Sequence, residues 1–408
     1  MGLRANGGSS FSLNAMRILT VCTSTEIFGA EIMSLNILLA FQRRGYQQLA
    51  VTSSWTDGKF SKRLAELGVA EVALPLGVLS KRISPRALWW TSNALVRAPK
   101  LWLGWHRTIN AFCPDVLLLT NPKQGLWLYP WLDIQPSFLI ESSMKAVTAA
   151  NRWMYSQLQR KLSGFVAVSR FMDGHLRDLG VDPKLIQVIY NCCRISSGDM
   201  SDHVGSRLNS PVRVGIAGQI SPHKGHDVLF QAAELLKKRG VHFEVLVFGA
   251  GQSEYISDLR ERIKLAGLIH QWKWMGYAED QQQMYRSMDI CVVPSCFDEP
   301  FGMVALEASR YGVPVVAARR GGLPEIVEHG RSGFLVEPEN AAEFADRLNW
   351  LIQNPERAHS MGLRGREKVL REFTQEKMVS DFEKIFNFTS RKSFMRGRLT
   401  DANGISCK

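Results

Sequence analysis

Residues 212–236, VRVGIAGQISPHKGHDVLFQAAELL, decide the fold class of this chain. The continuous apolar run 212–218 predicts a buried parallel strand, and the apolar spacing after Gly225 predicts an amphipathic helix. The loop between them places Lys224 and Gly225 at the carboxyl end of that strand. A strand, a loop and a helix in this order form the repeating unit of α/β proteins with parallel sheets.

The alternation of strands and helices continues on both sides of this segment. Apolar runs predict further strands at 16–24, 47–54, 115–120, 137–142, 164–169, 186–191, 243–249, 271–276, 290–295, 313–318 and 333–338. This pattern predicts an α/β fold of two doubly wound, Rossmann-like domains. Open sheets of this kind bind ligands at the carboxyl ends of their strands, so we expect the site in a cleft across which the two domains face each other.

A polar stretch rich in Ser and Gly, residues 196–210, lacks apolar periodicity and is predicted to be a linker. The length of 408 residues also favours two domains. The predicted segments are a flexible extension at 1–15, a first domain at 16–195, the linker at 196–210, a second domain at 211–370, a C-terminal helix at 371–390 and a basic tail at 391–408.

The charge balance favours anionic partners, because 50 Lys and Arg residues outnumber 38 Asp and Glu residues and give a net charge of +12. Phosphates, nucleic acid and an acidic membrane surface all fit this balance. The seven cysteines are scattered without a C-x-x-C pair, which argues against a disulfide framework or a zinc site and favours a reducing, cytoplasmic compartment. No apolar run reaches the roughly 18 to 20 residues that span a bilayer, and the N-terminal residues lack a signal-peptide core, so we expect a soluble or peripheral protein.

The segment DEPFGMVALE, residues 298–307, carries the most informative chemistry. Glu299 ends a loop after the predicted strand 290–295, and Glu307 lies eight positions later inside a predicted helix. Free N–H groups at a helix start suit a diphosphate, and Gly302 allows its close approach. Glu307, two turns into the helix, is placed to reach paired ribose hydroxyls. The alternative is that Glu299 only favours the helix dipole and Glu307 lies on a solvated face.

Lys224 occupies the matching loop of the same predicted domain and is a candidate phosphate clamp, although a solvated surface lysine is the simpler reading. His223 and His226 flank it without a set of metal ligands, so we expect local structural roles for both and no metal site. The stretch VFGAGQSE lacks the third glycine of a dinucleotide fingerprint, and no P-loop, H-E-x-x-H or G-x-S-x-G sequence is present. A dehydrogenase and a P-loop ATPase are therefore disfavoured.

Residues 72–114 contain no Asp or Glu and gather several cations and tryptophans. Such a composition suits the headgroup region of an anionic membrane. The predicted membrane or acceptor face comprises Lys81, Arg82, Arg86, Trp89 and Trp90. The alternative is a helical hairpin with core tryptophans and solvated cations. Nucleic acid is disfavoured because no nucleic-acid motif accompanies the basic residues.

Four ordered segments resemble the retaining GT-B glycosyltransferases called glycosyl transferases group 1: GQISPHKG, VFGAG, EPFGMVALEASRYGVPVV and GGLPEIVEHGRSGFLVEP. Looser similarities, FGAE, VAVSR and VIYNCC, lie in the first domain. The resemblance implies an E-x7-E pair in which Glu299 contacts the donor sugar and Glu307 holds the ribose. It implies catalytic roles for Glu299 and Lys224, and donor-binding roles for Gly29, Gln219, Lys224, Phe301, Gly302, Met303 and Glu307.

Two positions depart from the family pattern. Gln219 stands where an Arg five residues before the lysine is common, so leaving-group stabilisation is expected to depend more on Lys224. The stretch 139–144, LIESSM, has Glu141 where a histidine near the sugar is frequent, and no catalytic histidine is assigned.

The resemblance implies metal-independent hexosyl transfer with retention, from a nucleoside-diphosphate sugar to a hydroxyl acceptor. The expected acceptor is a lipid-linked saccharide or a growing surface polysaccharide at the inner face of the membrane, and no cofactor is expected beyond the donor. The second domain would bind the donor, the first would face the acceptor, and the helix 371–390 would cross back to the first. The alternatives are a non-catalytic GT-B scaffold, suggested by Gln219, and a nucleotide-sugar epimerase of similar fold.

Overall fold

The computed structural model describes residues 16–22, 29–56, 58–77, 84–193 and 211–397. Several predictions fall outside these ranges: the extension at 1–15, the linker at 196–210, the end of the tail, and Lys81 and Arg82.

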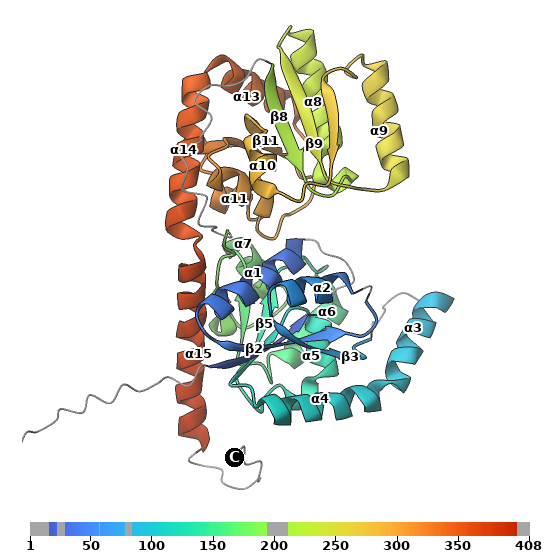
Figure 1. Cartoon of the computed structure of the whole chain (residues 1–408), viewed down its shortest axis with the longest axis vertical. Helices are drawn as coiled ribbons and strands as arrows, with labels where there is room; N and C mark the ends of the chain where they lie inside the picture. The colour runs from blue at the N-terminus through green and yellow to red at the C-terminus, as the bar shows by residue number, and fades with distance from the viewer. Residues whose placement is uncertain (1–15, 23–28, 57, 78–83, 194–210, 398–408) are drawn as a thin grey trace, which may run out of the picture. The chain divides into compact units, whose positions relative to one another are not determined.

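A seven-stranded sheet in the order β3-β2-β1-β4-β5-β6-β7 forms the first half of the fold (Figure 1). Its strands are β1 (Arg17–Cys22), β2 (Gln47–Ser53), β3 (Ala70–Leu74), β4 (Val116–Leu119), β5 (Ser137–Glu141), β6 (Gly164–Ala167) and β7 (Ile186–Val188). The strand order reverses between β1 and β4, which pair in parallel, so a topological switch point lies between them. The strand β3 was not predicted, because AEVAL is short and half-exposed.

A six-stranded parallel sheet in the order β10-β9-β8-β11-β12-β13 forms the second half. Its strands are β8 (Val212–Ala217), β9 (Phe243–Phe248), β10 (Trp272–Gly276), β11 (Ile290–Val293), β12 (Val315–Ala318) and β13 (Gly333–Val336). Here the order reverses between β8 and β11, which are neighbours in the sheet. The two doubly wound parallel sheets confirm the predicted fold class.

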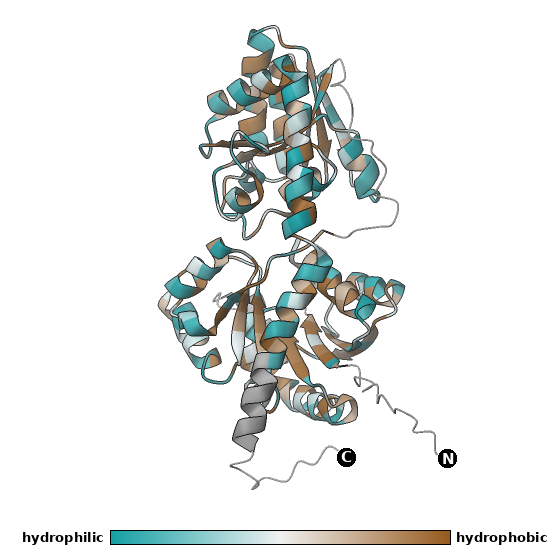
Figure 2. Cartoon of the chain, turned by 90° about the vertical axis from the view of Figure 1, so that its left-hand side faces the viewer, coloured by the Kyte–Doolittle hydropathy of each residue, from teal (hydrophilic) through white to brown (hydrophobic). Residues whose placement is uncertain are grey.

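Helices connect the strands and cover the sheets. In the first half they are α1 (Gly29–Arg43), α2 (Lys59–Glu66), α3 (Pro85–Val96), α4 (Ala98–Phe112), α5 (Pro122–Trp127), α6 (Ala149–Leu158) and α7 (Arg170–Asp178). In the second half they are α8 (His226–Lys238), α9 (Ser253–Leu265), α10 (Gln281–Arg286), α11 (Met303–Arg310), α12 (Leu323–Ile326), α13 (Ala341–Gln353) and α14 (Pro355–Glu372). Figure 2 shows apolar residues concentrated on the strands and polar residues on the outer helix faces. Among the described helices, none has the length and apolarity to cross a membrane.

Contacts divide the chain into two compact units. Unit 1 comprises Met1–Ile140, Gln157–Gly164 and Glu383–Lys408, and unit 2 comprises Glu141–Ser156 and Phe165–Phe382. Unit 2 therefore includes the whole second sheet and also most of α6, most of β6, the helix α7 and the strand β7 of the first sheet.

The last helix, α15, spans Gln375–Gly397, whereas the sequence predicted a helix at 371–390 and a tail from 391. From Glu383 onward α15 belongs to unit 1. There Glu383 accepts hydrogen bonds from Arg44 and Tyr46, and the buried Phe386 packs against Phe41 and Phe138.

Candidate active site

Two loops at the carboxyl ends of β8 and β11 bring Lys224 and Glu299 together. Lys224 ends a 3-10 turn, Pro222–Lys224, and its Nζ lies 2.7 Å from Glu299 Oε1. The hydroxyl of Ser295 donates a second hydrogen bond of 2.7 Å to the same oxygen. Both charged side chains are mostly buried, with 23% of Lys224 and 11% of Glu299 exposed. A preformed ion pair therefore occupies the place where the sequence predicted the two catalytic groups.

Backbone contacts fix the separation of these loops. Gly225 has a left-handed backbone with φ of 77°, and a Cβ there would lie 1.8 Å from the carbonyl oxygen of Pro294. The amide of Cys296 also donates a hydrogen bond of 2.8 Å to the carbonyl oxygen of His223. The loops touch through main-chain atoms, so the backbones that carry Lys224 and Glu299 are held at a fixed separation.

The two histidines beside Lys224 lie in local structure. His223 packs edge-on against Phe297 at 5.1 Å, and its pKa is lowered by burial and by the neighbouring Lys224. His226 is fully buried, and burial lowers its pKa to about 4. Its Nδ1 lies 3.4 Å from the carbonyl oxygen of Ser221. Across the described ranges, no cluster of three or more His, Cys, Asp or Glu side chains is arranged to hold a metal ion.

The start of α11 adjoins Glu299. Gly302 caps this helix with φ of 109°, and a Cβ there would lie 2.7 Å from Leu323 Cδ2. Met303 is the first helical residue. Phe301 is 2% exposed and packs against aromatic rings of Tyr190 and Phe373, so its side chain is part of the core. Only the backbone of Phe301 is therefore placed to serve a ligand.

Glu307 lies one turn and a half into α11 and is held by α10. The hydroxyl of Tyr285 donates a hydrogen bond of 2.8 Å to Oε2, and Gln281 Nε2 lies 3.5 Å from Oε1. Burial raises the pKa of Glu307 to about 7, against the opposing effect of these two hydrogen bonds. Tyr285 is itself buried and stacks on Tyr311. The carboxyl group is thus oriented and titrates near neutral pH.

A second pair of glycines joins the loop after β8 to the loop after β9. A Cβ on Gly249 would lie 1.8 Å from the carbonyl oxygen of Gly218, and one on Gly251 would lie 2.0 Å from that of Ile220. Gln219 lies between these contacts with its side chain exposed. The loop of the VFGAG segment therefore supports the loop that leads to Lys224.

Other predicted residues lie elsewhere. Gly29 begins α1 in unit 1, and is exposed, whereas the remaining predicted donor-binding residues belong to unit 2. Glu141, where the family often has a histidine, is fully buried and accepts hydrogen bonds from Tyr155 and Ser143. Near it, His175 accepts a hydrogen bond from the Lys145 amide, and burial lowers its pKa.

The predicted basic, aromatic face separates into exposed and buried tryptophans. Trp89 is 59% exposed, whereas Trp90 packs against Trp55 and Trp89. Trp105 is fully buried, and Trp102 donates a hydrogen bond to the carbonyl oxygen of Trp127. Arg86 lies within α3. The buried Trp105 agrees with the alternative of a helical hairpin with core tryptophans, and the exposed Trp89 agrees with a membrane or acceptor face.

Sequence reasoning missed several groups that orient the site. Ser295 is the last residue of the predicted strand 290–295, and a polar residue at the carboxyl end of a parallel strand could have been predicted to face the site. Arg320 Nη1 donates to the carbonyl oxygen of Cys296 at 2.7 Å, and its Nε donates to Asp298 at 3.0 Å, which fixes the loop before Glu299. Glu325 accepts hydrogen bonds from the first two amides of α7, at 2.9 and 3.0 Å. No sequence signal linked Arg320 or Glu325 to partners so distant along the chain.

Residues 205–368 match the model of the family described as glycosyl transferases group 1. The chain is 39% identical over 150 residues to a D-inositol 3-phosphate glycosyltransferase of Arthrobacter sp. (strain FB24), covering 36% of this chain and 35% of that protein. It is 27% identical over 226 residues to an N-acetyl-alpha-D-glucosaminyl L-malate synthase of Bacillus anthracis, covering 54% and 58%. The chain thus spans between about a third and three fifths of these relatives' lengths.

Solved structures share the fold over nearly the whole chain. Anabaena Alr3699/HepE in complex with UDP and glucose aligns with a TM-score of 0.71 and 22% identity, covering 92% of this chain and 99% of that one. TarM of S. aureus, in complex with UDP and alpha-GlcNAc-glycerol, aligns with a TM-score of 0.72 and 14% identity, covering 91% and 100%. These likenesses and the family match confirm the resemblance inferred from the sequence.

Proposed function

Because residues 205–368 belong to the glycosyl transferases group 1 family, we propose that the chain transfers a sugar from a nucleoside-diphosphate sugar to a hydroxyl acceptor. The Lys224–Glu299 pair carries this proposal, since it joins a cation and a carboxylate at the carboxyl ends of adjacent parallel strands. Ligands bind at this edge in open α/β sheets. Glu307, in the helix that follows Glu299, supplies a carboxylate that accepts hydrogen bonds from the ribose hydroxyls of the donor.

In the proposed reaction, the bond between the anomeric carbon and the donor phosphate breaks, and the acceptor hydroxyl forms the new bond on the same face. The departing phosphate oxygen takes the acceptor's proton, so no protein base is needed. Lys224 and the amides at the start of α11 stabilise the negative charge on the leaving diphosphate. Glu299 stabilises the positive charge that develops on the sugar. This scheme requires no metal ion.

Gln219 concentrates the positive charge of this site on Lys224. The glutamine is exposed and uncharged, so it can donate hydrogen bonds to a phosphate without neutralising it. Lys224 already contacts Glu299, and a bound diphosphate would have to share its three donors with that carboxylate. Glu299 therefore both orients Lys224 and moderates its charge before the donor binds.

We propose that the nucleotide of the donor binds through the same residues, with its ribose on Glu307. The structural neighbours from Anabaena and S. aureus were solved with UDP, and two relatives are named as a D-inositol 3-phosphate glycosyltransferase and an N-acetyl-alpha-D-glucosaminyl L-malate synthase. Glu307 has one carboxyl oxygen on Tyr285 and the other 3.5 Å from Gln281. Because the contact with Gln281 is long, Oε1 of Glu307 remains available to a ribose hydroxyl.

We propose a lipid-linked saccharide or growing glycan as the acceptor, presented at an anionic membrane surface. Trp89, Leu95, Val96 and Leu103 on α3 and α4 are 58 to 78% exposed. The segment 72–114 around them has no acidic residue to repel anionic lipid. Exposed apolar side chains among cations are suited to insertion at the headgroup level.

Vesicle sedimentation tests the membrane proposal. The protein is expected to co-sediment with vesicles of phosphatidylglycerol and phosphatidylcholine, but not with phosphatidylcholine alone. The Trp89→Ala, Leu103→Ala double variant should lose most of this binding, while Leu265→Ala, which replaces a still more exposed apolar residue on α9, should keep it. Equal sedimentation of all three proteins would reject this face as the membrane contact.

A thermal-shift panel with UDP, GDP, ADP, CMP and NAD tests the donor site. A ligand at about 100 times its dissociation constant stabilises the protein by roughly 2.7 kcal/mol. Stabilisation by one nucleoside diphosphate should be lost in Glu307→Ala and kept in Glu261→Ala, which removes an exposed carboxylate from α9. Silence across the panel, or stabilisation that survives in Glu307→Ala, would count against the site.

A transfer assay with the matching nucleotide sugar tests the reaction. Lys224→Ala should lower turnover, and the product should carry the sugar on a new acceptor with its anomeric configuration unchanged. An altered nucleotide sugar without an acceptor product would indicate an epimerase. Nucleotide binding without any chemical change, across lipid-linked and glycan acceptors, would indicate a scaffold protein.

A further inference from the structure

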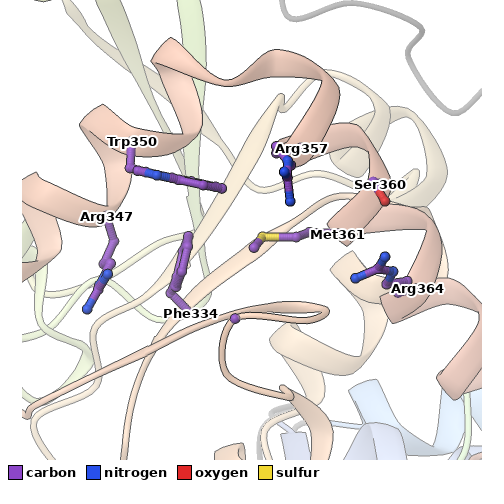
Figure 3. A pocket seen from close by; sticks show the side chains of 8 residues that line it. Phe334, Arg347, Trp350, Arg357, Ser360, Met361 and Arg364 are labelled. Atoms are coloured by element: carbon purple, nitrogen blue, oxygen red, sulfur yellow. The ribbon is translucent and has the colours of Figure 1, made fainter.

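A pocket of about 300 Å³ lies in unit 2 between β13, α13 and α14. Phe334 comes from β13, Arg347 and Trp350 from α13, and Arg357, Ser360, Met361 and Arg364 from α14. Figure 3 shows the three arginines spaced around the side chains of Phe334, Trp350 and Met361. Its volume is at the lower end of the range for small-molecule sites.

This pocket is separate from the candidate active site. Phe334 is the second residue of β13, whose first residue, Gly333, pairs with Val315 at the start of β12. The helix α13 follows β13 and carries Arg347 and Trp350 in its second half, and Gly330, which precedes β13, also lines the pocket. The pocket thus lies at the amino ends of the strands, whereas Lys224 and Glu299 follow their carboxyl ends.

Two of the three arginines of the pocket lack the acidic partners that surface arginines usually have. Arg357 and Arg364 are exposed on one face of α14, two turns and about 10 Å apart along the helix. Among the described residues, neither forms an ion pair or a hydrogen bond. The third, Arg347, forms one ion pair, in which its Nη2 lies 3.7 Å from Oε1 of Glu343. None of the eight described residues that line the pocket is acidic.

Arg347 also carries an unpaired polar atom at the pocket wall. Its Nε is buried and has no hydrogen-bond partner among the described residues. Its guanidinium lies over the ring of Phe334, 5.1 Å from the centroid, which fixes the plane of the group. Because protein atoms cover Nε, a ligand in the pocket would contact the remainder of the Arg347 side chain, 37% of which is exposed.

The floor of the pocket is apolar and packed. Phe334 is 5% exposed and meets Trp350 edge-on at 5.3 Å, and Met361 is 6% exposed. The hydroxyl of Ser360 adds one neutral donor on the same face of α14 as Arg357 and Arg364. The site therefore combines cations and a hydroxyl at its rim with an apolar surface beneath them.

We propose that this pocket binds a phosphorylated small molecule, with its phosphate groups held by Arg347, Arg357 and Arg364 and its carbon skeleton against Trp350 and Met361. Guanidinium groups match phosphate oxygens with paired hydrogen bonds, and three of them exceed what one phosphate monoanion needs. The ligand is thus expected to carry at least two negative charges. This binding is not part of the proposed sugar transfer, because none of these residues belongs to the donor site.

Isothermal titration of the full chain with inorganic pyrophosphate tests the proposal. The wild type is expected to show two classes of sites, one at Lys224 and one at the arginine pocket. The Arg357→Gln, Arg364→Gln variant should lose the second class, with its affinity at least tenfold lower, and should bind nucleoside diphosphate as the wild type does. Lys224→Met should show the reverse loss, so failure at one site is distinguishable from failure at the other.

A matched control separates specific binding from the loss of two charges. Arg260→Gln, Lys264→Gln removes two exposed cations from α9 in the same unit. This control should keep both classes of pyrophosphate sites. The proposal is overturned if the Arg357→Gln, Arg364→Gln isotherm equals that of the wild type, or if the α9 control loses the same binding. Both pairs are exposed, and circular dichroism spectra identical to the wild type would show that the variants fold.

Discussion

Replacing Gly225 by alanine tests whether backbone contact fixes the two loops of the site. The chain offers a matched control, because Gly225 and Gly240 have nearly equal left-handed backbones, with φ of 77° and 72°. At Gly240 an added Cβ meets no atom within 4 Å, whereas at Gly225 it lies 1.8 Å from the Pro294 carbonyl oxygen. Gly240→Ala therefore measures the backbone cost alone, and Gly225→Ala adds the collision.

The expected magnitudes follow from these contacts. A left-handed alanine costs about 1 kcal/mol, which is the whole effect expected for Gly240→Ala. At Gly225 the carbonyl must retreat by about 1.6 Å to reach an ordinary contact of 3.4 Å, and a backbone atom cannot rotate away. Overpacking of this kind adds about 1–3 kcal/mol. The total of about 2–4 kcal/mol for Gly225→Ala should lower the melting temperature by about 4–16 °C, against about 2–4 °C for Gly240→Ala.

The displacement should also reach the ligand site. Lys224 is bonded to Gly225, and a misplacement of about 1 Å can cost about 100-fold in activity. Nucleoside-diphosphate affinity should therefore fall in Gly225→Ala and stay at the wild-type value in Gly240→Ala. Circular dichroism melting and nucleotide titration give the two readouts. Equal melting temperatures in the two variants, or wild-type affinity in Gly225→Ala, would refute the view that main-chain contact holds Lys224 against Glu299.

Four further predictions concern three individual side chains. Burial raises the pKa of Glu307 from 4.5 to about 7, so the folded state favours the protonated carboxyl group. The contribution of this group to the free energy of unfolding is full below pH 4.5 and is lost as the pH rises through 7. In urea unfolding, Glu307→Gln should therefore be up to about 3 kcal/mol more stable than the wild type at pH 8 and equal to it at pH 4. Nucleotide affinity of the wild type should rise about tenfold from pH 6 to pH 8 as this carboxylate ionises, and a Glu307→Gln profile that rises equally would contradict its ribose role. Ser295→Ala removes a buried donor to Glu299 and should lower stability by about 1–3 kcal/mol, whereas no change in melting temperature would count against that hydrogen bond. Glu325→Gln should speed amide exchange at Arg170 and Phe171 about tenfold, and unchanged exchange there would exclude the capping role.

The sequence predicted every strand with a continuous or aromatic apolar run, and missed β3, whose run is interrupted by a charged residue. Val116–Leu119 and Ile290–Val293 are wholly buried, so their residues form unbroken apolar runs that stand out from the neighbouring helices. Ala70–Leu74 is half-exposed and includes Glu71, which interrupts the run. The equally short and equally solvated strand Trp272–Gly276 was predicted, because its two tryptophans give an apolar signal that Ala70–Leu74 lacks.

The candidate site divides in the same way between local and distant information. Lys224 and Glu299 follow predicted strands within about six residues, and Glu307 lies in the next predicted helix, so their place near the carboxyl edge could be inferred from the chain order. The contact of Glu307 with Tyr285 crosses 22 positions and joins two helices, and no local pattern encodes it. For Phe301 the local pattern suggested too much. Its position beside Gly302 indicated a ligand contact, but its ring is buried against Tyr190.

The Lys224–Glu299 ion pair also constrains when the site can form during folding. Its partners are 75 residues apart, and closing a loop of that length costs about 4 kcal/mol of chain entropy. A single ion pair cannot offset this cost, so the contact must wait until β8 and β11 have paired through their backbones. In a refolding experiment, nucleotide binding should therefore appear after collapse and after helix formation, and its rate would report when the centre of the second sheet is complete.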